Sequence, residues 1–245
     1  SVLLGRYYSR HEVGHFSQSA KWNMMGSAVI TSTVSSVAQP ALATAARGKE
    51  GEELELLRAM LRATAWLSVP ALTGLALVAR PFIVLLLGIK WLPCVPLLQV
   101  LCLWGAMKPI NNLLTQVAVS RGRSQTYMWV TMAVAVVQVV GLMVCRQWGI
   151  YAMVWSYVVV NALFLGVWLL IVRRMVGLGL RMVAADAGRF VVAAAVAMPA
   201  AWLATRGIES LPWLLAARIV MGGGIYLALT HRQLLVWLRK LRPNA

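Results

Sequence analysis

The sequence predicts an all-α fold: a polytopic membrane helical bundle with about seven transmembrane helices. Three observations support this prediction. The 245-residue chain is 60% apolar and 12% charged, whereas soluble domains are nearer half apolar and a quarter charged. Seven apolar stretches approach the ~20 residues that a helix needs to cross the hydrocarbon core. None of these stretches contains an aspartate or a glutamate.

The predicted spans follow one another with short connections. They are 22–46, 63–79, 94–119, 127–145, 149–172, 187–205 and 211–229. Several of the 11 tryptophans fall near span ends, where amphipathic rings prefer to lie. The predicted organisation is a periplasmic loop and helix lead-in at 1–21, five spans at 22–172, and the last two spans with a cytoplasmic tail at 173–245.

Two segments between the spans are too charged or too short to cross. Residues 47–62 hold four of the seven acidic residues. Their apolar residues recur at helical spacing, which predicts a short amphipathic helix at the inner interface. A solvated connector is the alternative. Residues 81–88, PFIVLLLG, predict a re-entrant or interfacial turn of helix, with an extension of the second span as the alternative.

The basic residues predict the orientation. Apart from Lys108 and Arg218, which lie inside predicted spans, 14 Lys and Arg residues flank one side of the bundle and seven flank the other. The richer side is then cytoplasmic, with the C-terminus inside and residues 1–21 outside. An external start, an odd number of spans and Ser1 in place of Met predict that further helices precede this sequence. The net charge of +16 favours contact with anionic membrane lipids over nucleic acid, because no nucleic-acid-binding module is recognisable.

Little in the sequence points to catalysis. All seven acidic residues lie outside the predicted spans or at their edges, and the three cysteines lack CxxC spacing. His11, Glu12 and His15 match the letters of an HExxH pattern, but we expect no zinc site there. We therefore predict a protein that is not an enzyme, with no catalytic residue, no metal and no cofactor.

Lys108 is the sharpest candidate for function, because an ionisable group deep in a span is costly and usually functional. It lies 14 residues after Cys94 and 11 before Val119, so it is ~17–21 Å from either end of a straight helix. Its side chain is too short to reach either surface from there. We predict that Lys108 faces a polar path. The alternative is that it marks a loop between two short helices.

The residues around Lys108 extend this polar face. Asn111, Asn112 and Gln116 lie three, four and eight residues further on, on one side of a helix. Trp104 is one turn earlier, at the spacing of a cation–π contact. Pro109 is a candidate hinge, because a proline inside a helix frees a backbone carbonyl.

Arg218 is the second cation inside a span and a further candidate for the substrate path. It lies seven residues after Leu211, ~10 Å deep. An arginine at that depth can also snorkel to the headgroups, which is the alternative. Glycines 222–224 follow it and predict close helix packing, with a kink as the other use.

The first span carries a stripe of small polar residues. Ser32, Ser35, Ser36 and Gln39 share one helical face. This face predicts either a lining for a hydrophilic path or an adhesive surface between helices. Pro40 follows it and is a candidate hinge for the inner end of the span.

Four segments carry a family resemblance. LGRYYSRHEVGHFSQSAKW precedes the first span, and residues 39–42 give a proline-containing helix end before a charged loop. RPFIVLLLGIKWLPCVPLLQVLCLWG and SRGRSQT follow in order. Over residues 3–175 these segments resemble the bacterial polysaccharide flippases, the lipid-linked oligosaccharide exporters of the multidrug/oligosaccharidyl-lipid/polysaccharide superfamily. The last two spans match that family only in hydropathy.

This resemblance implies the C-terminal half of a 14-helix transporter with two bundles around a central cavity. Its expected activity is translocation of undecaprenyl-pyrophosphate-linked oligosaccharide or polysaccharide units across the bacterial inner membrane by alternating access. The expected partners are the lipid-linked glycan, anionic membrane lipids and the missing N-terminal half. Lys108 and Arg218 would suit a pyrophosphate. Two alternatives stay open: a drug or small-molecule exporter of the same superfamily, and a non-catalytic membrane component of a glycan-assembly system.

Overall fold

The computed structural model describes residues 10–48 and 51–241, with the backbone alone for residues 232–241. All regular structure in these residues is helical. The long helices are α2 (Arg10–Ala45), α3 (Glu52–Leu87), α4 (Cys94–Ser120), α5 (Ser124–Cys145), α6 (Gly149–Val176), α8 (Arg189–Ala204) and α9 (Leu211–Leu241). Short helical turns connect them: η1 (Ile89–Trp91), η2 (Arg146–Trp148), α7 (Leu180–Val183) and the π-helical η3 (Ala184–Gly188). Residues 1–9 of the predicted lead-in and 242–245 of the predicted tail lie outside the described residues.

Each predicted span corresponds to one long helix. For α4, α5, α6 and α8 the two agree to within four residues at either end. The first span begins 12 residues earlier than predicted, at Arg10 of α2, and the last continues 12 residues further, to Leu241 of α9. These two helices are longer than their apolar stretches because polar residues extend them beyond the hydrocarbon boundary.

The second span differs most from its prediction. Helix α3 runs unbroken from Glu52 through Pro70 and Pro81 to Leu87. The alternative, in which the second span extends into 81–88, is therefore confirmed, and the interfacial turn there is wrong. Residues 52–62 form the start of α3, so a separate interfacial helix or solvated connector there is also wrong. Leu57 and Leu61 of that segment are fully buried in the protein, because their apolar stripe packs on neighbouring helices instead of on lipid.

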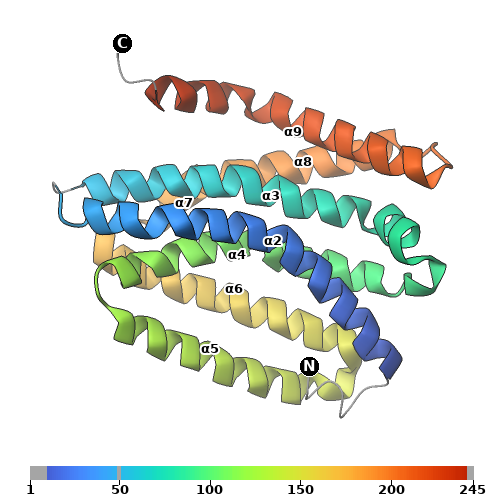
Figure 1. Cartoon of the computed structure of the whole chain (residues 1–245), viewed down its shortest axis with the longest axis horizontal. Coiled ribbons are helices and arrows are strands. Elements are labelled where there is room, and N and C mark those ends of the chain that lie inside the picture. Colours follow the sequence, from blue (N-terminus) through green and yellow to red (C-terminus); the bar gives the residue numbers. More distant parts are fainter. Residues whose placement is uncertain (1–9, 49–50, 242–245) are drawn as a thin grey trace.

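Helix α4 is the centre of the packing. It has the most extensive contacts with α2 and α3, and it also packs on α6. Figure 1 shows α9 and α5 at opposite edges of the bundle. No residue of α5 is buried, which leaves its apolar side chains available to lipid. The largest fully buried side chains include Leu42, Leu57, Leu61, Leu98, Leu113, Leu114 and Val117.

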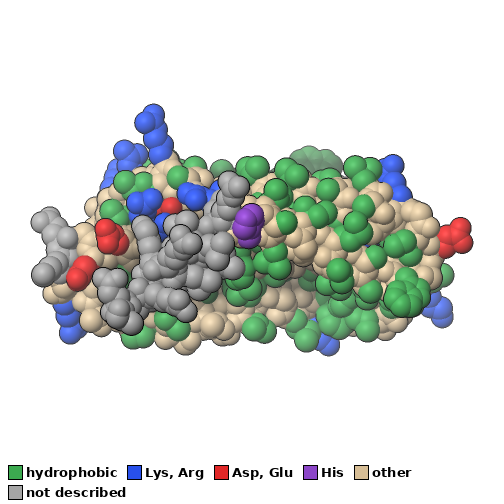
Figure 2. All heavy atoms as spheres, turned by 90° about the horizontal axis from the view of Figure 1, so that it is seen from above, with side chains coloured by type: hydrophobic (Ala, Val, Ile, Leu, Met, Phe, Trp, Pro, Cys, Tyr) green, Lys and Arg blue, Asp and Glu red, His purple; other side chains and the backbone are tan. Residues whose placement is uncertain are grey.

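The chain is a polytopic helical membrane protein. Four stretches of the described residues are long and apolar enough to cross a membrane: Glu52–Leu87, Ser124–Val176, Leu180–Ala204 and Leu211–His231. The second of these contains both α5 and α6. Helices α2 and α4 are not among them, because their serines, amides and Lys108 lower the mean hydropathy. On the face seen in Figure 2, Lys and Arg gather toward the two ends, and hydrophobic side chains cover much of the surface between them.

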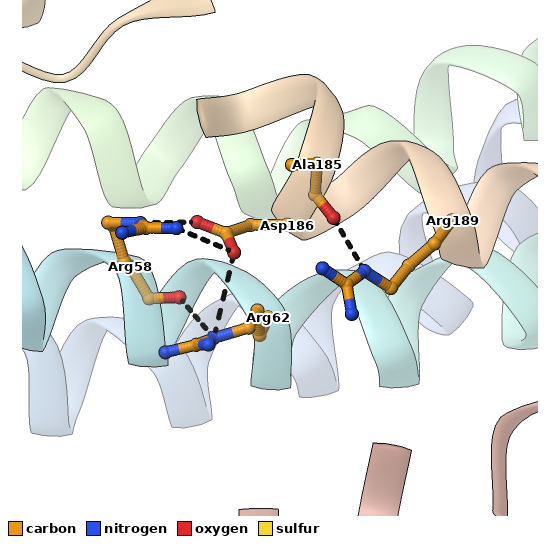
Figure 3. A network of polar contacts seen from close by, with 5 residues as sticks. All are labelled: Arg58, Arg62, Ala185, Asp186 and Arg189. Carbon is orange, nitrogen blue, oxygen red and sulfur yellow. Dashed lines mark hydrogen bonds and ion pairs between the residues drawn. The ribbon is translucent and has the colours of Figure 1, made fainter. Parts of the chain in front are cut away.

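Ion pairs fasten one end of the bundle. Asp186 of η3 is 1% exposed and accepts a hydrogen bond from Arg58 Nε at 2.7 Å, with Arg62 Nε at 3.9 Å (Figure 3). Glu53 accepts hydrogen bonds from Arg121 Nη2 at 2.6 Å and Nε at 3.0 Å. A buried carboxylate is tolerated only with such partners. These pairs hold the first turns of α3 against η3 and the end of α4.

Candidate functional site: the polar seam between α2 and α4

Four buried polar side chains of α2 face α4, and with Ser35 and Asn112 we call this contact the α2–α4 seam. His15, Ser19, Asn23 and Ser27 are each at most 7% exposed. Their spacing of four residues places them along one face of the helix. Such a repeat lets two helices approach closely, and each buried polar side chain in it needs a hydrogen-bond partner.

The seam uses the backbone of α4 as its acceptor. Ser19 Oγ donates to the Cys94 carbonyl at 3.0 Å, and Asn23 Nδ2 donates to the Leu101 carbonyl at 2.8 Å. Gly105 makes room for this, because a Cβ at that position would clash with Asn23 Nδ2. Helices α2 and α4 thus pack in direct contact, because α2 supplies side-chain donors and α4 supplies accessible backbone carbonyls.

Near the other end of the seam, two residues singled out in the sequence meet. Asn112 Nδ2 of α4 donates to Ser35 Oγ of α2 at 2.5 Å. Asn111 Oδ1 is buried without a hydrogen-bond partner among the described residues, and Gln116 is half-buried one turn further on. An unpaired buried amide oxygen is costly, so this position offers an acceptor to an incoming donor or water.

Lys108 is half-buried in an unbroken helix. Helix α4 runs through Pro109 to Ser120, so the alternative of a loop at Lys108 is wrong. No hydrogen bond or ion pair joins Lys108 to another residue in the described part of the chain, and Trp104 makes no cation–π contact with it. No described residue therefore compensates its charge, which lies 14 residues from the start of α4 and 12 from its end.

The predicted serine stripe divides in the structure. Ser35 belongs to the seam, whereas Ser32, Ser36 and Gln39 are exposed. Ser32 and Ser36 hydroxyls donate to backbone carbonyls of their own helix, which lowers the cost of meeting an apolar neighbour. Pro40 is also exposed, and α2 continues through it to Ala45; its role as a hinge stays a prediction.

Arg218 is separate from the seam. Its Nη1 donates to the Leu77 carbonyl of α3 at 3.1 Å, and its Nε donates to Thr205 Oγ1 at 3.3 Å. The Leu77 carbonyl is free because Pro81, four residues on, has no N–H to donate. Arg218 therefore has partners within the protein, and the structure does not bring it together with Lys108.

A second proline of α3 repeats this arrangement. Pro70 leaves the Trp66 carbonyl without its helical donor, and Tyr226 Oη of α9 donates to that carbonyl at 3.0 Å. Gly222, between Arg218 and Tyr226, brings α9 close: a Cβ there would meet Met198, Leu77 and Ala201 side chains at 3.5–3.7 Å. Close packing, as predicted, is the use of this glycine. Sequence reasoning missed the two proline–carbonyl contacts, although the proline positions were visible.

Comparisons with known proteins relate part of the chain to one family. Residues 1–96 match a family model described as "Polysaccharide biosynthesis protein". An uncharacterized membrane protein in the cps region of Klebsiella pneumoniae is 31% identical over 96 residues, which cover 39% of this chain and 20% of that protein. Residues 1–96 are thus similar to the polysaccharide biosynthesis protein family. This confirms, at the level of the family, the resemblance found in the sequence.

A second relative extends the match along the chain. Teichuronic acid biosynthesis protein TuaB of Bacillus subtilis (strain 168) is 27% identical over 176 residues, which cover 69% of this chain and 35% of that protein. The chain thus spans about a third or less of the length of these relatives. No solved structure matches it significantly. This similarity is the observation that directs attention to polysaccharide biosynthesis.

Proposed function

We propose that this protein is part of a flippase that moves undecaprenyl-pyrophosphate-linked glycan units across the bacterial inner membrane. The observation that carries the proposal is Lys108, a cation with no ion-pair partner among the described residues, about 18–21 Å from either end of α4. A phosphate-headed lipid must carry its charge through the hydrocarbon, and a cation at mid-depth lowers the cost of that passage. Similarity to a polysaccharide biosynthesis family supports a glycan as the cargo.

The polar residues near Lys108 suit such a cargo. Asn111 Oδ1 offers an acceptor for a sugar hydroxyl, and Asn112 and Ser35 form a neutral hydrogen-bonded pair beside it. Gln116, Ser32, Ser36 and Gln39 continue polar surface from α4 and α2 toward one end. In this proposal these residues contact the headgroup in turn, while the lipid tail stays in the bilayer.

The remaining architecture follows from the same proposal. All the long helices, α2 and α4 included, cross the membrane, and the chain forms one of two bundles in a 14-helix transporter. The exposed polar face of α2 then meets the other bundle across the substrate path. The end with Asp186 and Glu53 is cytoplasmic, as is the C-terminus, since more basic residues flank that side. Bundle rocking about Lys108 gives alternating access, with Pro40 and Pro109 as hinges.

The test measures where the glycan lipid resides. In cells deleted for the protein, spheroplasts are probed with an added glycosidase that cannot cross the membrane. Expression of the full-length protein should make the lipid-linked glycan accessible to the enzyme, and deletion should leave it shielded and accumulating. Equal accessibility in both strains would contradict the proposal. Unchanged accessibility of the lipid-linked glycan, together with altered efflux of cationic dyes, would instead indicate a small-molecule exporter.

A further inference from the structure

An apolar groove of about 460 Å³ lies between α3, α4 and α8, lined in part by Ala76, Leu77, Val100, Leu103, Met198 and Trp202. On a helix with 100° per residue, Leu103 and Lys108 point roughly 140° apart around α4. The groove therefore opens on a different face of α4 from Lys108, and it takes no part in the path proposed above.

Arginines surround one end of this groove. Arg218 donates to the carbonyl of Leu77, a lining residue. The Arg206 guanidinium carbon lies 3.8 Å from the ring centroid of Trp202, another lining residue. Arg80, one turn beyond Leu77 toward the end of α3, is exposed and interacts electrostatically with Arg218. All three cations lie on the side of the groove nearer the helix ends, and thus nearer the membrane surface.

The charge at this end is uncompensated. None of the three arginines forms an ion pair with a carboxylate in the described residues. An arginine has five N–H groups, and Arg218 uses two of them, toward Leu77 and Thr205. Like charges held together in a partly apolar environment repel, and an anion bound between them relieves that repulsion. Guanidinium groups are also well shaped for phosphate oxygens.

We propose that this groove binds an anionic phospholipid of the bilayer, with its phosphodiester between Arg80, Arg206 and Arg218 and one acyl chain along Leu103 and Met198. The positive charge of the arginines favours an anionic headgroup. The apolar lining favours a ligand with an acyl chain over a free anion. The arginines lie nearer the membrane surface and the apolar lining lies deeper. This arrangement matches the positions of the headgroup and the acyl chain of a bilayer lipid. This proposal is independent of transport activity.

The headgroup is tested with purified full-length protein in dodecyl maltoside by native mass spectrometry. Phosphatidylglycerol should bind in preference to phosphatidylcholine with the same chains. The double variant Arg80→Gln/Arg206→Gln should weaken phosphatidylglycerol binding roughly 10- to 30-fold. The charge-matched variant Lys21→Gln/Lys90→Gln, which removes two exposed cations away from the groove, should change it less than about twofold. Retained binding in Arg80→Lys/Arg206→Lys would support recognition of the headgroup by charge.

The acyl chain is tested by filling the groove. Leu103→Trp should abolish bound phosphatidylglycerol, whereas Leu86→Trp, at a lipid-facing position of α3 outside the groove, should not. Four results would overturn the proposal: equal binding of both phospholipids, no loss in Leu103→Trp, thermal protection by inorganic phosphate equal to that by phosphatidylglycerol, or displacement by equimolar undecaprenyl phosphate. The last two would assign the site to a free anion or to a polyprenyl lipid.

Discussion

Arg218 of α9 donates a hydrogen bond to the Leu77 carbonyl of α3, the acceptor that Pro81 leaves without its helical donor. Tyr226 does the same for the Trp66 carbonyl freed by Pro70. Helix α3 thus keeps its course through two prolines because α9 supplies the donors that the helix lacks. The contacts also explain how α9 attaches to the bundle.

The first prediction concerns Arg218 and Pro81 as a pair. Arg218→Met should lower the free energy of unfolding by roughly 1–3 kcal/mol, because it leaves the Leu77 carbonyl unsatisfied. In a Pro81→Ala background the loss should be smaller, since the alanine N–H restores the helical donor. Denaturant titration in mixed micelles gives the double-mutant cycle. Additive losses would show that the carbonyl is not what Arg218 satisfies.

The second prediction applies the same reasoning to Tyr226. Tyr226→Phe removes only the hydroxyl, so it should cost about 0.5–2 kcal/mol of stability without disturbing the packing of the ring. Combining it with Pro70→Ala should recover part of that loss. Thermal unfolding monitored by tryptophan fluorescence measures both variants. Equal destabilisation by Tyr226→Phe with proline or alanine at position 70 would contradict the account.

Part of this structure was predictable from the sequence. The spans were predictable, because apolar length is a strong signal, whereas the sequence left open whether the helix continues through Lys108 and Pro109. The course of α3 was not, since a proline reads locally as a break and its compensation comes from Arg218, 141 residues away. The burial of Glu53 likewise depends on a distant partner, Arg121. The α2–α4 seam was detectable as polar residues every four positions from His15.

The third prediction tests the α2–α4 seam. Gly105→Ala places a Cβ in collision with Asn23 Nδ2 and must break the bond from Asn23 to the Leu101 carbonyl. The expected loss of stability is roughly 1–3 kcal/mol. Gly166→Ala is the matched control, because nothing lies within 4 Å of its Cβ position in α6. That variant should be neutral or up to about 1 kcal/mol more stable. Similar changes in stability for Gly105→Ala and Gly166→Ala would contradict the close approach of the two helices at Gly105.

The fourth prediction is a pH dependence at His15, which precedes the predicted first span. Burial and the neighbouring His11 lower the pKa of His15 below its ordinary value of 6.5. The unfolded chain then binds a proton more readily than the folded one, so stability falls as the pH drops through about 6.5 toward the lowered value. His15 also faces Cys94 Sγ at 3.3 Å and the Trp91 ring.

Thermal unfolding between pH 7.5 and 5 measures this dependence. The wild-type melting temperature should fall with pH, and His15→Gln should flatten the curve over that range. His11→Gln removes one of the two causes of the lowered pKa of His15, so it should weaken the pH dependence without abolishing it. A wild-type curve that rises toward pH 5 would mean that His15 is stabilised in its charged form.

The central claim is that Lys108 presents its charge to an anionic lipid-linked glycan, and export by Lys108 variants tests it most directly. Surface polysaccharide is measured in cells lacking the native transporter, at matched expression of Lys108→Met, Lys108→Arg and Lys90→Met, the last removing an exposed cation. We expect Lys108→Met to lower export by about tenfold or more, Lys108→Arg to retain much of it and Lys90→Met to match wild type. Wild-type export by Lys108→Met would contradict the claim.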